Sequence, residues 1–157
     1  MLTSHVTAVV AAGVLLAAGA LEPRPLSSLP ADLQPLAEAL QAHGFHVSLA
    51  LPPRAAAYGQ FDPRSRTLWI SPLSFELGIG RQTFLHEAAH AIQSCPTGVL
   101  RPIGWTFPLD PAVERGIQAI LFHHYPTNRV VEAEAFGIQG QPDAVPRLLQ
   151  ALRQRCR

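Results

Sequence analysis

One segment, RQTFLHEAAHAIQSC at residues 81–95, constrains the fold of this chain more than any other. His86 and His90 lie four residues apart, so on a helix both imidazoles project from one face and can reach a single ion. Apolar residues recur through the segment at helical spacing, which predicts a helix from about Gly80 to Ser94 with a buried face. Two small alanines between the histidines favour the helix and let a facing element approach closely.

Glu87 directly follows the first histidine, where it can reach a water on such an ion without binding the ion itself. Two neutral nitrogen ligands, an open position and a carboxylate that accepts a proton are the arrangement that a zinc hydrolase needs. In a chain of this composition the H-E-x-x-H pattern is expected by chance roughly 0.014 times. The alternative is a helix whose two histidines occupy ordinary hydrogen-bonded positions. The pattern favours a Zn²⁺ site at His86 and His90.

A zinc site of this kind needs a third protein ligand, and the candidates lie in RVVEAEAF at residues 129–136. A helical carboxylate among small and apolar residues is typical of a buried ligand, because a buried charge must be paired or bound to a metal. Glu132 and Glu134 are two residues apart, which places them about 200° apart on a helix. At most one of them is therefore expected to bind the ion. Two exposed glutamates are the alternative, which fits poorly with the apolar neighbours.

The length of 157 residues predicts one domain with a real hydrophobic core. Hydrophobic residues make up 48% of the chain and charged residues 15%, which is typical of a globular protein. A formal charge of +1 gives no basic field, so nucleic acid is excluded as an expected partner.

The first twenty residues differ from the rest. Val6–Ala20 is an uncharged run of apolar and small residues, and Ala18-Gly-Ala20 fits a small-x-small cleavage site. We interpret residues 1–20 as a secretory signal peptide and residues 21–157 as the mature domain, exported to the periplasm or the medium. An uncleaved membrane anchor through residues 6–20 and a buried first helix are the alternatives, and only the anchor implies a membrane partner.

Export makes the two cysteines a candidate disulfide, because an oxidising compartment favours pairing. Cys95 follows the His86/His90 helix, and Cys156 is the penultimate residue. The bridge closes a loop of about 60 residues, for which the chain-entropy model gives roughly 4 kcal/mol. The alternatives are two unrelated thiols, or Cys95 as a zinc ligand, although it lies off the face of the two histidines.

A small antiparallel hairpin or sheet, packed on the His86/His90 helix and the later glutamate helix, predicts an α+β fold. Asp62-Pro-Arg-Ser65 is good turn chemistry and predicts a hairpin between the segments on either side of it. In chain order we expect an extended leader at 21–28, a helix at 29–40 capped by Gly44, a strand at 45–51, hairpin strands at 57–61 and 66–71, the helix at 80–94, a helix from the Asp110 cap to His123, a helix from Thr127 or Asn128 to Ile138 ended by Gly140, and a last helix at 142–155.

This order, with HEAAH on one helix and EAEA on a later one, resembles the compact gluzincin metallopeptidases, including small proteins of the minigluzincin type. The resemblance covers roughly Tyr58–Gln139 and implies a zincin-like domain. In the glutamate motif of these families the first glutamate binds the zinc. The resemblance therefore implies that Glu132 is the third zinc ligand and that Glu134 supports the helix or the ligands. Phe136 stands where these families usually carry an Asp or Asn that orients a ligand histidine, so this contact must come from elsewhere or be missing.

The resemblance also implies a reaction: hydrolysis of a peptide or protein substrate, with Glu87 taking the proton from a zinc-activated water. The developing oxyanion needs a second donor, for which His123, His124 and Tyr125 are candidates. The two histidines equally fit a helix C-terminus, where the helix dipole favours them. Tyr58 on the hairpin is a further candidate, and the hairpin edge can take an extended substrate by strand addition. The alternatives are a zinc-binding structural or regulatory module without turnover, favoured by Phe136, and a metal-free exported interaction domain.

Overall fold

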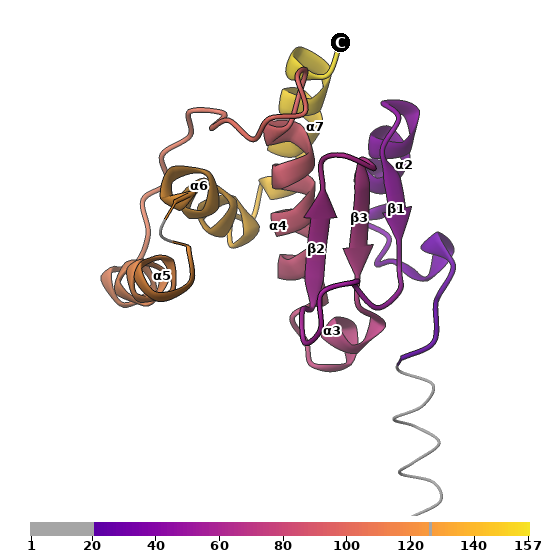
Figure 1. Cartoon of the computed structure of the whole chain (residues 1–157), viewed down its shortest axis with the longest axis horizontal. Coiled ribbons are helices and arrows are strands. Elements are labelled where there is room, and N and C mark those ends of the chain that lie inside the picture. Colours follow the sequence, from indigo (N-terminus) through magenta and orange to yellow (C-terminus); the bar gives the residue numbers. More distant parts are fainter. Residues whose placement is uncertain (1–20, 126) are drawn as a thin grey trace, which may run out of the picture.

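The computed structural model describes residues 21–125 and 127–157, so the predicted signal peptide at residues 1–20 lies outside the described residues. The described part is an α+β fold with six α-helices and a three-stranded sheet (Figure 1). Its elements are a 3-10 helix Leu26–Ser28, α2 Gln34–Ala42, β1 His46–Ser48, β2 Gly59–Asp62, β3 Thr67–Ile70, α3 Pro72–Glu76, α4 Gly80–Gln93, α5 Pro111–His124, α6 Arg129–Gln139 and α7 Ala144–Arg155. None of the helices described is long and apolar enough to cross a membrane.

The predicted hairpin is confirmed. β2 runs antiparallel to β3, with Gly59 opposite Ile70 and Asp62 opposite Thr67. The Asp62 carboxylate accepts hydrogen bonds from the backbone N–H of Arg64 and from Ser65, which closes the turn as its sequence predicts.

The sheet as a whole is mixed, so the expectation of an antiparallel sheet is wrong for β1. β1 pairs in parallel with β3, and the strand order is β1-β3-β2. The connection between β1 and β2 reverses the chain, so β1 runs opposite to β2. Because β3 is antiparallel to β2, β1 must then be parallel to β3. β2 therefore lies at one edge of the sheet, beside α4.

Prolines shift the boundaries at the start of the domain. The expected extended leader instead forms a 3-10 turn at Leu26–Ser28, after Arg24 has paired with Leu49. The first helix begins at Gln34 rather than 29, because Pro35 lacks a backbone donor and fits only in the first turn. α3 was not predicted, since five residues are too short to show a helical period.

α4 is the centre of the molecule. The sheet lies on one side of it, and α6 and α7 pack on the other (Figure 1). Every residue from Phe84 to Gln93 is buried, which confirms the predicted helix and extends its buried face around the whole circumference. This burial places His86 and His90 in the interior, facing α6.

The C-terminal helices follow the predicted signals closely. Asp110 caps α5 by accepting a hydrogen bond of 2.8 Å from the Ala112 N–H. α6 lies between α4 and α5, and Gly140 follows its last residue (Figure 1). The structure contains the predicted disulfide between Cys95 and Cys156, which joins the end of α4 to the end of α7.

Candidate metal centre

Three of the predicted site residues meet between α4 and α6. The Nε2 atoms of His86 and His90 lie 3.0 Å apart. Glu132, in the first turn of α6, places Oε2 at 3.2 Å from the first of these nitrogens and 3.4 Å from the second. The three side chains are close enough together to hold one metal ion. Their exposed fractions are 9%, 6% and 8%, so this donor set is shielded from solvent.

The charges at this centre support one another. Burial raises the pKa of Glu132, but hydrogen bonds from both histidines outweigh it and lower the pKa to about 2. Burial lowers the pKa of His90, yet the Glu132 carboxylate and the charge of Glu87 outweigh this effect and raise it. A carboxylate facing two ring nitrogens favours positive charge between them, whether a proton or a metal ion carries it.

Gln93 determines which nitrogen of His90 faces the centre. Its Nε2 donates to the Val131 carbonyl at 3.0 Å and to the Glu134 carboxylate at 2.8 Å. Both partners are acceptors, so the amide is fixed with Oε1 toward His90 Nδ1, 2.7 Å away. That oxygen requires a proton on Nδ1. The neutral His90 ring therefore presents the lone pair of Nε2 to His86 and Glu132, as a metal ligand must.

Gln139 makes the matching contact to the other histidine. Its Oε1 lies 3.0 Å from His86 Nδ1, and the Phe136 ring packs edge-on against the imidazole with 4.6 Å between centroids. The orienting contact that the gluzincin resemblance places at position 136 thus comes from Gln139, about one turn further along α6. Neither glutamine was predicted from the sequence. Only Gln93 had a local signal, because it lies three residues after His90 on the same helix.

Glu134 lies apart from the three ligands and organises the structure behind them. Its carboxylate accepts a hydrogen bond from Gln93 and three from successive backbone N–H groups of the loop before α5. These N–H groups belong to Ile103, Gly104 and Trp105, at 2.6–2.7 Å. With four donors on two oxygens, Glu134 has little capacity left for an ion. It supports His90 through Gln93.

Glu87 points from α4 toward the edge strand β2. It is 8% exposed, and burial raises its pKa, an effect that the neighbouring histidines oppose and the charge of Glu132 adds to. Gly59 makes this position possible: a Cβ on Gly59 would lie 2.7 Å from Glu87 Oε1. A cavity of about 140 Å³ is lined by Glu87, the three candidate ligands and residues of β2, so the Glu87 carboxylate and the candidate ligands face the same space.

Of the predicted oxyanion donors, only Tyr125 reaches this cavity. It lines the cavity, and its pKa is raised by burial and by the carboxylates of Glu132 and Glu87. His123 and His124 are exposed near the end of α5, with their rings against Phe122 and each other. The helix keeps both histidines toward solvent, and the chain turns inward only at the tyrosine.

A wider hollow opens from the centre toward solvent. It has a volume of about 670 Å³ and is lined by His86, Glu87, Tyr125 and the loop before β2, with Tyr58 on its rim. Arg54, in that loop, lines both this hollow and the small cavity. Arg54 was not predicted from the sequence, since no motif surrounds it. Comparisons of the chain with protein-family models, with curated proteins and with solved structures found no match.

Proposed function

We propose that this protein is an exported zinc-dependent peptidase. The observation that carries the proposal is the convergence of two histidines, a glutamate ligand and a separate buried glutamate on one cavity beside an open strand edge. The resemblance of residues 58–139 to compact gluzincins points to the same activity. The substrate class is a peptide or an unfolded segment of a protein.

The donor set fits zinc. Two imidazole nitrogens and one carboxylate oxygen are typical of catalytic zinc sites, which keep a fourth position open. The fixed amide of Gln93 directs a lone pair of His90 to the centre, where Glu132 adds a negative charge. When bound there, Zn²⁺ supplies a Lewis acid that lowers the pKa of a ligated water toward 7.

The chain's own residues perform the proton transfers. Glu87 accepts a proton from the attacking water. The same carboxyl group then delivers the proton to the leaving amine. Tyr125 donates a hydrogen bond to the developing oxyanion. The edge of β2 holds the substrate backbone by strand addition, beside Glu87.

The direct test uses Glu87→Gln in the mature domain, residues 21–157. This change keeps the shape of the side chain and removes the base, so zinc content should stay near one per chain while peptide hydrolysis falls about 10²–10⁴-fold. The matched variant His86→Ala should lose most of its zinc, because two protein ligands rarely hold the ion. Unchanged hydrolysis in Glu87→Gln would refute the assigned base.

The same measurements separate the alternatives. A zinc-binding structural or regulatory module would hold zinc and cleave no peptide, and a metal-free interaction domain would hold no zinc. Phe136 was the reason to consider the module, because it removes the usual partner of a ligand histidine. With Gln139 on His86 Nδ1, that reason is weaker.

Export is supported by the disulfide, since a cytosolic chain is kept reduced. The proposed leader ends near Ala20, and the mature protein carries the Cys95–Cys156 bridge. Mass spectrometry of the native protein should find an N-terminus near residue 21 and no alkylatable thiol. A retained Met1 together with two free thiols would place the protein in the cytoplasm.

A further inference from the structure

The wide hollow beside the metal centre has one permanently cationic side chain on its wall. Among the described residues that line this hollow of about 670 Å³ and the small cavity next to it, Arg54 is the only arginine, and the chain contains no lysine. A guanidinium keeps its positive charge at any pH near neutrality. The charge acts on the Tyr125 hydroxyl, where it opposes the rise in pKa that burial causes. The space beside the candidate ligands is therefore under the influence of a fixed cation.

The loop that carries Arg54 is held in place on both sides of this residue. Pro52 and Pro53 restrict the backbone just before it, and Pro52 is buried. The Arg54 N–H donates a hydrogen bond of 2.9 Å to the side-chain oxygen of Gln60 on β2. The Arg54 carbonyl accepts a hydrogen bond of 3.3 Å from the Ala57 N–H. The backbone at position 54 is therefore fixed relative to the edge strand.

The guanidinium of Arg54 has no acceptor of its own within residues 21–125 and 127–157. Other arginines, such as Arg24 and Arg81, pair with a carboxylate. Glu87 and Glu132 line the same cavity as Arg54, yet neither forms an ion pair with it. When zinc is bound at the proposed centre, its two positive charges offset those two carboxylates. The charge of Arg54 is then left for an anionic group of the substrate.

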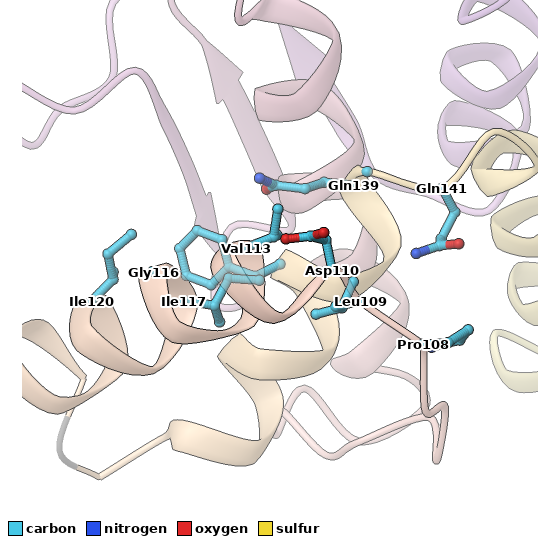
Figure 2. Close-up of a pocket in the computed structure, with 11 residues that line it drawn as sticks. Pro108, Leu109, Asp110, Val113, Gly116, Ile117, Ile120, Gln139 and Gln141 are labelled. Carbon is cyan, nitrogen blue, oxygen red and sulfur yellow. The ribbon is translucent and has the colours of Figure 1, made fainter.

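A second hollow, of about 590 Å³ between α5 and α6, offers an anion no such partner. Figure 2 shows Val113, Ile117 and Ile120 along one wall of it. Among the described residues that line this hollow, the only charged one is Asp110, whose negative charge repels a carboxylate. An anionic end of a substrate is therefore favoured at Arg54 and disfavoured between the two helices.

We propose that Arg54 binds the C-terminal carboxylate of the substrate, so that the protein cleaves peptides close to a free C-terminus. The inference rests on the proposed peptidase function and names its substrate class. A planar guanidinium can donate two parallel hydrogen bonds to one carboxylate, which makes it the side chain best suited to this group. The loop with Arg54 leads into the Gly59 end of β2. A substrate strand that pairs antiparallel with β2 has its C-terminal end there.

The test compares two peptides of one sequence, one with a free C-terminal carboxylate and one with a C-terminal amide. Wild type should cleave the acid with a kcat/KM about tenfold or more above that of the amide, because the amide cannot form the charge-assisted hydrogen bonds. Mass spectrometry of a longer peptide acid should find the first cut within its last few residues. Equal rates for acid and amide, or first cuts far from the C-terminus, overturn the proposal.

Variants of Arg54 show whether this side chain causes the preference. Arg54→Gln should lower the kcat/KM of the acid about tenfold, to near that of the amide, and Arg54→Lys should keep part of the preference because it keeps only the charge. Arg64→Gln is the matched control, since Arg64 is an exposed loop arginine at the other end of β2 that lines neither space. Zinc content and circular dichroism establish that each variant has folded. If Arg54→Gln slows acid and amide equally, the proposal is wrong.

Equilibrium binding of the two peptides to zinc-loaded Glu87→Gln, with and without Arg54→Gln, separates this proposal from the peptidase function. The acid should bind about tenfold more tightly than the amide, and added salt should reduce the difference, because the exposed guanidinium is screened. If wild type cleaves neither peptide but the acid binds more tightly through Arg54, the carboxylate site stands and the peptidase function fails. Equal binding of acid and amide, or a preference that Arg54→Gln leaves unchanged, removes the carboxylate site.

Discussion

Gln93 and Glu134 form a buried hydrogen-bond network that ends at His90, one of the three candidate ligands. The Gln93 side chain is fully buried, and both of its polar atoms form hydrogen bonds, with His90, Val131 and Glu134 as partners. Glu134 in turn holds the loop at residues 103–105. A buried network with every member satisfied favours one arrangement strongly, because each unmade hydrogen bond costs about 1–3 kcal/mol. The orientation of His90 is thereby set before any ion arrives.

Gln93→Leu should therefore weaken zinc binding about 10–100-fold, the usual cost of losing a partner behind a metal ligand. It should also destabilise the fold, because Val131 O and Glu134 lose a donor. A competition titration against a chromophoric chelator measures the affinity. Gln41→Leu, at an exposed position of α2, is the control and should bind zinc as wild type does. Equal zinc affinity in both variants would show that Gln93 does not orient the ligand.

Glu87→Gln should raise the free energy of unfolding of the zinc-free protein near neutral pH. Burial raises the pKa of Glu87 above its ordinary value of 4.5. As the pH rises from 4.5 through the folded-state pKa, the folded protein keeps a proton that the unfolded chain has released, so stability falls. An uncharged glutamine removes that loss. Urea unfolding with chelator present should show the gain at about pH 7 and none at about pH 4. A variant less stable than wild type at neutral pH contradicts this account.

At the scale of elements, the approach of β2 to α4 creates the cavity. The strand can come this close only because position 59 carries no side chain, and Glu87 fills the space. The strand is also the sheet edge, where the proposed function places the substrate backbone. One contact between a strand and a helix thus brings Glu87, the three candidate ligands and the sheet edge together.

Gly59→Ala should destabilise the fold by about 1–3 kcal/mol, the usual effect of overpacking. It should also lower peptide hydrolysis more than zinc content, because the added Cβ meets Glu87 and not the ligands. Denaturant unfolding, zinc analysis and a peptide assay measure the three effects. Gly140→Ala is the comparison, since its added Cβ would meet nothing within 4 Å. If Gly59→Ala equals Gly140→Ala in stability and activity, β2 can accommodate a side chain at position 59, and the predicted clash with Glu87 does not occur.

At the scale of the whole molecule, the centre lies where the N-terminal sheet and α4 meet the C-terminal helices α5 and α6 (Figure 1). The candidate ligands come from both halves, since His86 and Glu132 are 46 residues apart in sequence. The disulfide spans a sequence separation of 61 and encloses the loop, α5, α6 and α7. It therefore limits how far the second half can separate from the first in the unfolded chain.

Replacing Cys95 and Cys156 together by Ala should lower the free energy of unfolding by about 2–5 kcal/mol. Neither cysteine contacts the ligands, so zinc affinity of the folded protein should change less than in Gln93→Leu. Thermal unfolding and the chelator titration test the two halves of this prediction. A double variant as stable as wild type would show that packing alone holds α7 to α4.

Local patterns in the sequence predicted the elements that local physics decides. The helix of α4, the Asp62 turn and the Asp110 cap each depend on residues within a few positions, so their spacing and turn chemistry were enough. The disulfide pairing was predicted because only two cysteines exist. The gluzincin resemblance selected Glu132 over Glu134, and the structure places Glu132 with the histidines.

Contacts between distant segments could not be predicted in this way. The parallel pairing of β1, the hydrogen bond from His86 to Gln139 and the position of Arg54 each depend on contacts between distant parts of the chain. The local sequence of either part does not predict such a contact. Likewise, residues 123–125 were equally good candidates for the oxyanion donor by their chemistry. Only the course of the chain at the end of α5 shows that Tyr125 is the one that lines the cavity. Spacing determines which side chains share a face of a helix. Packing of whole elements determines what that face meets, and therefore which residues form the site.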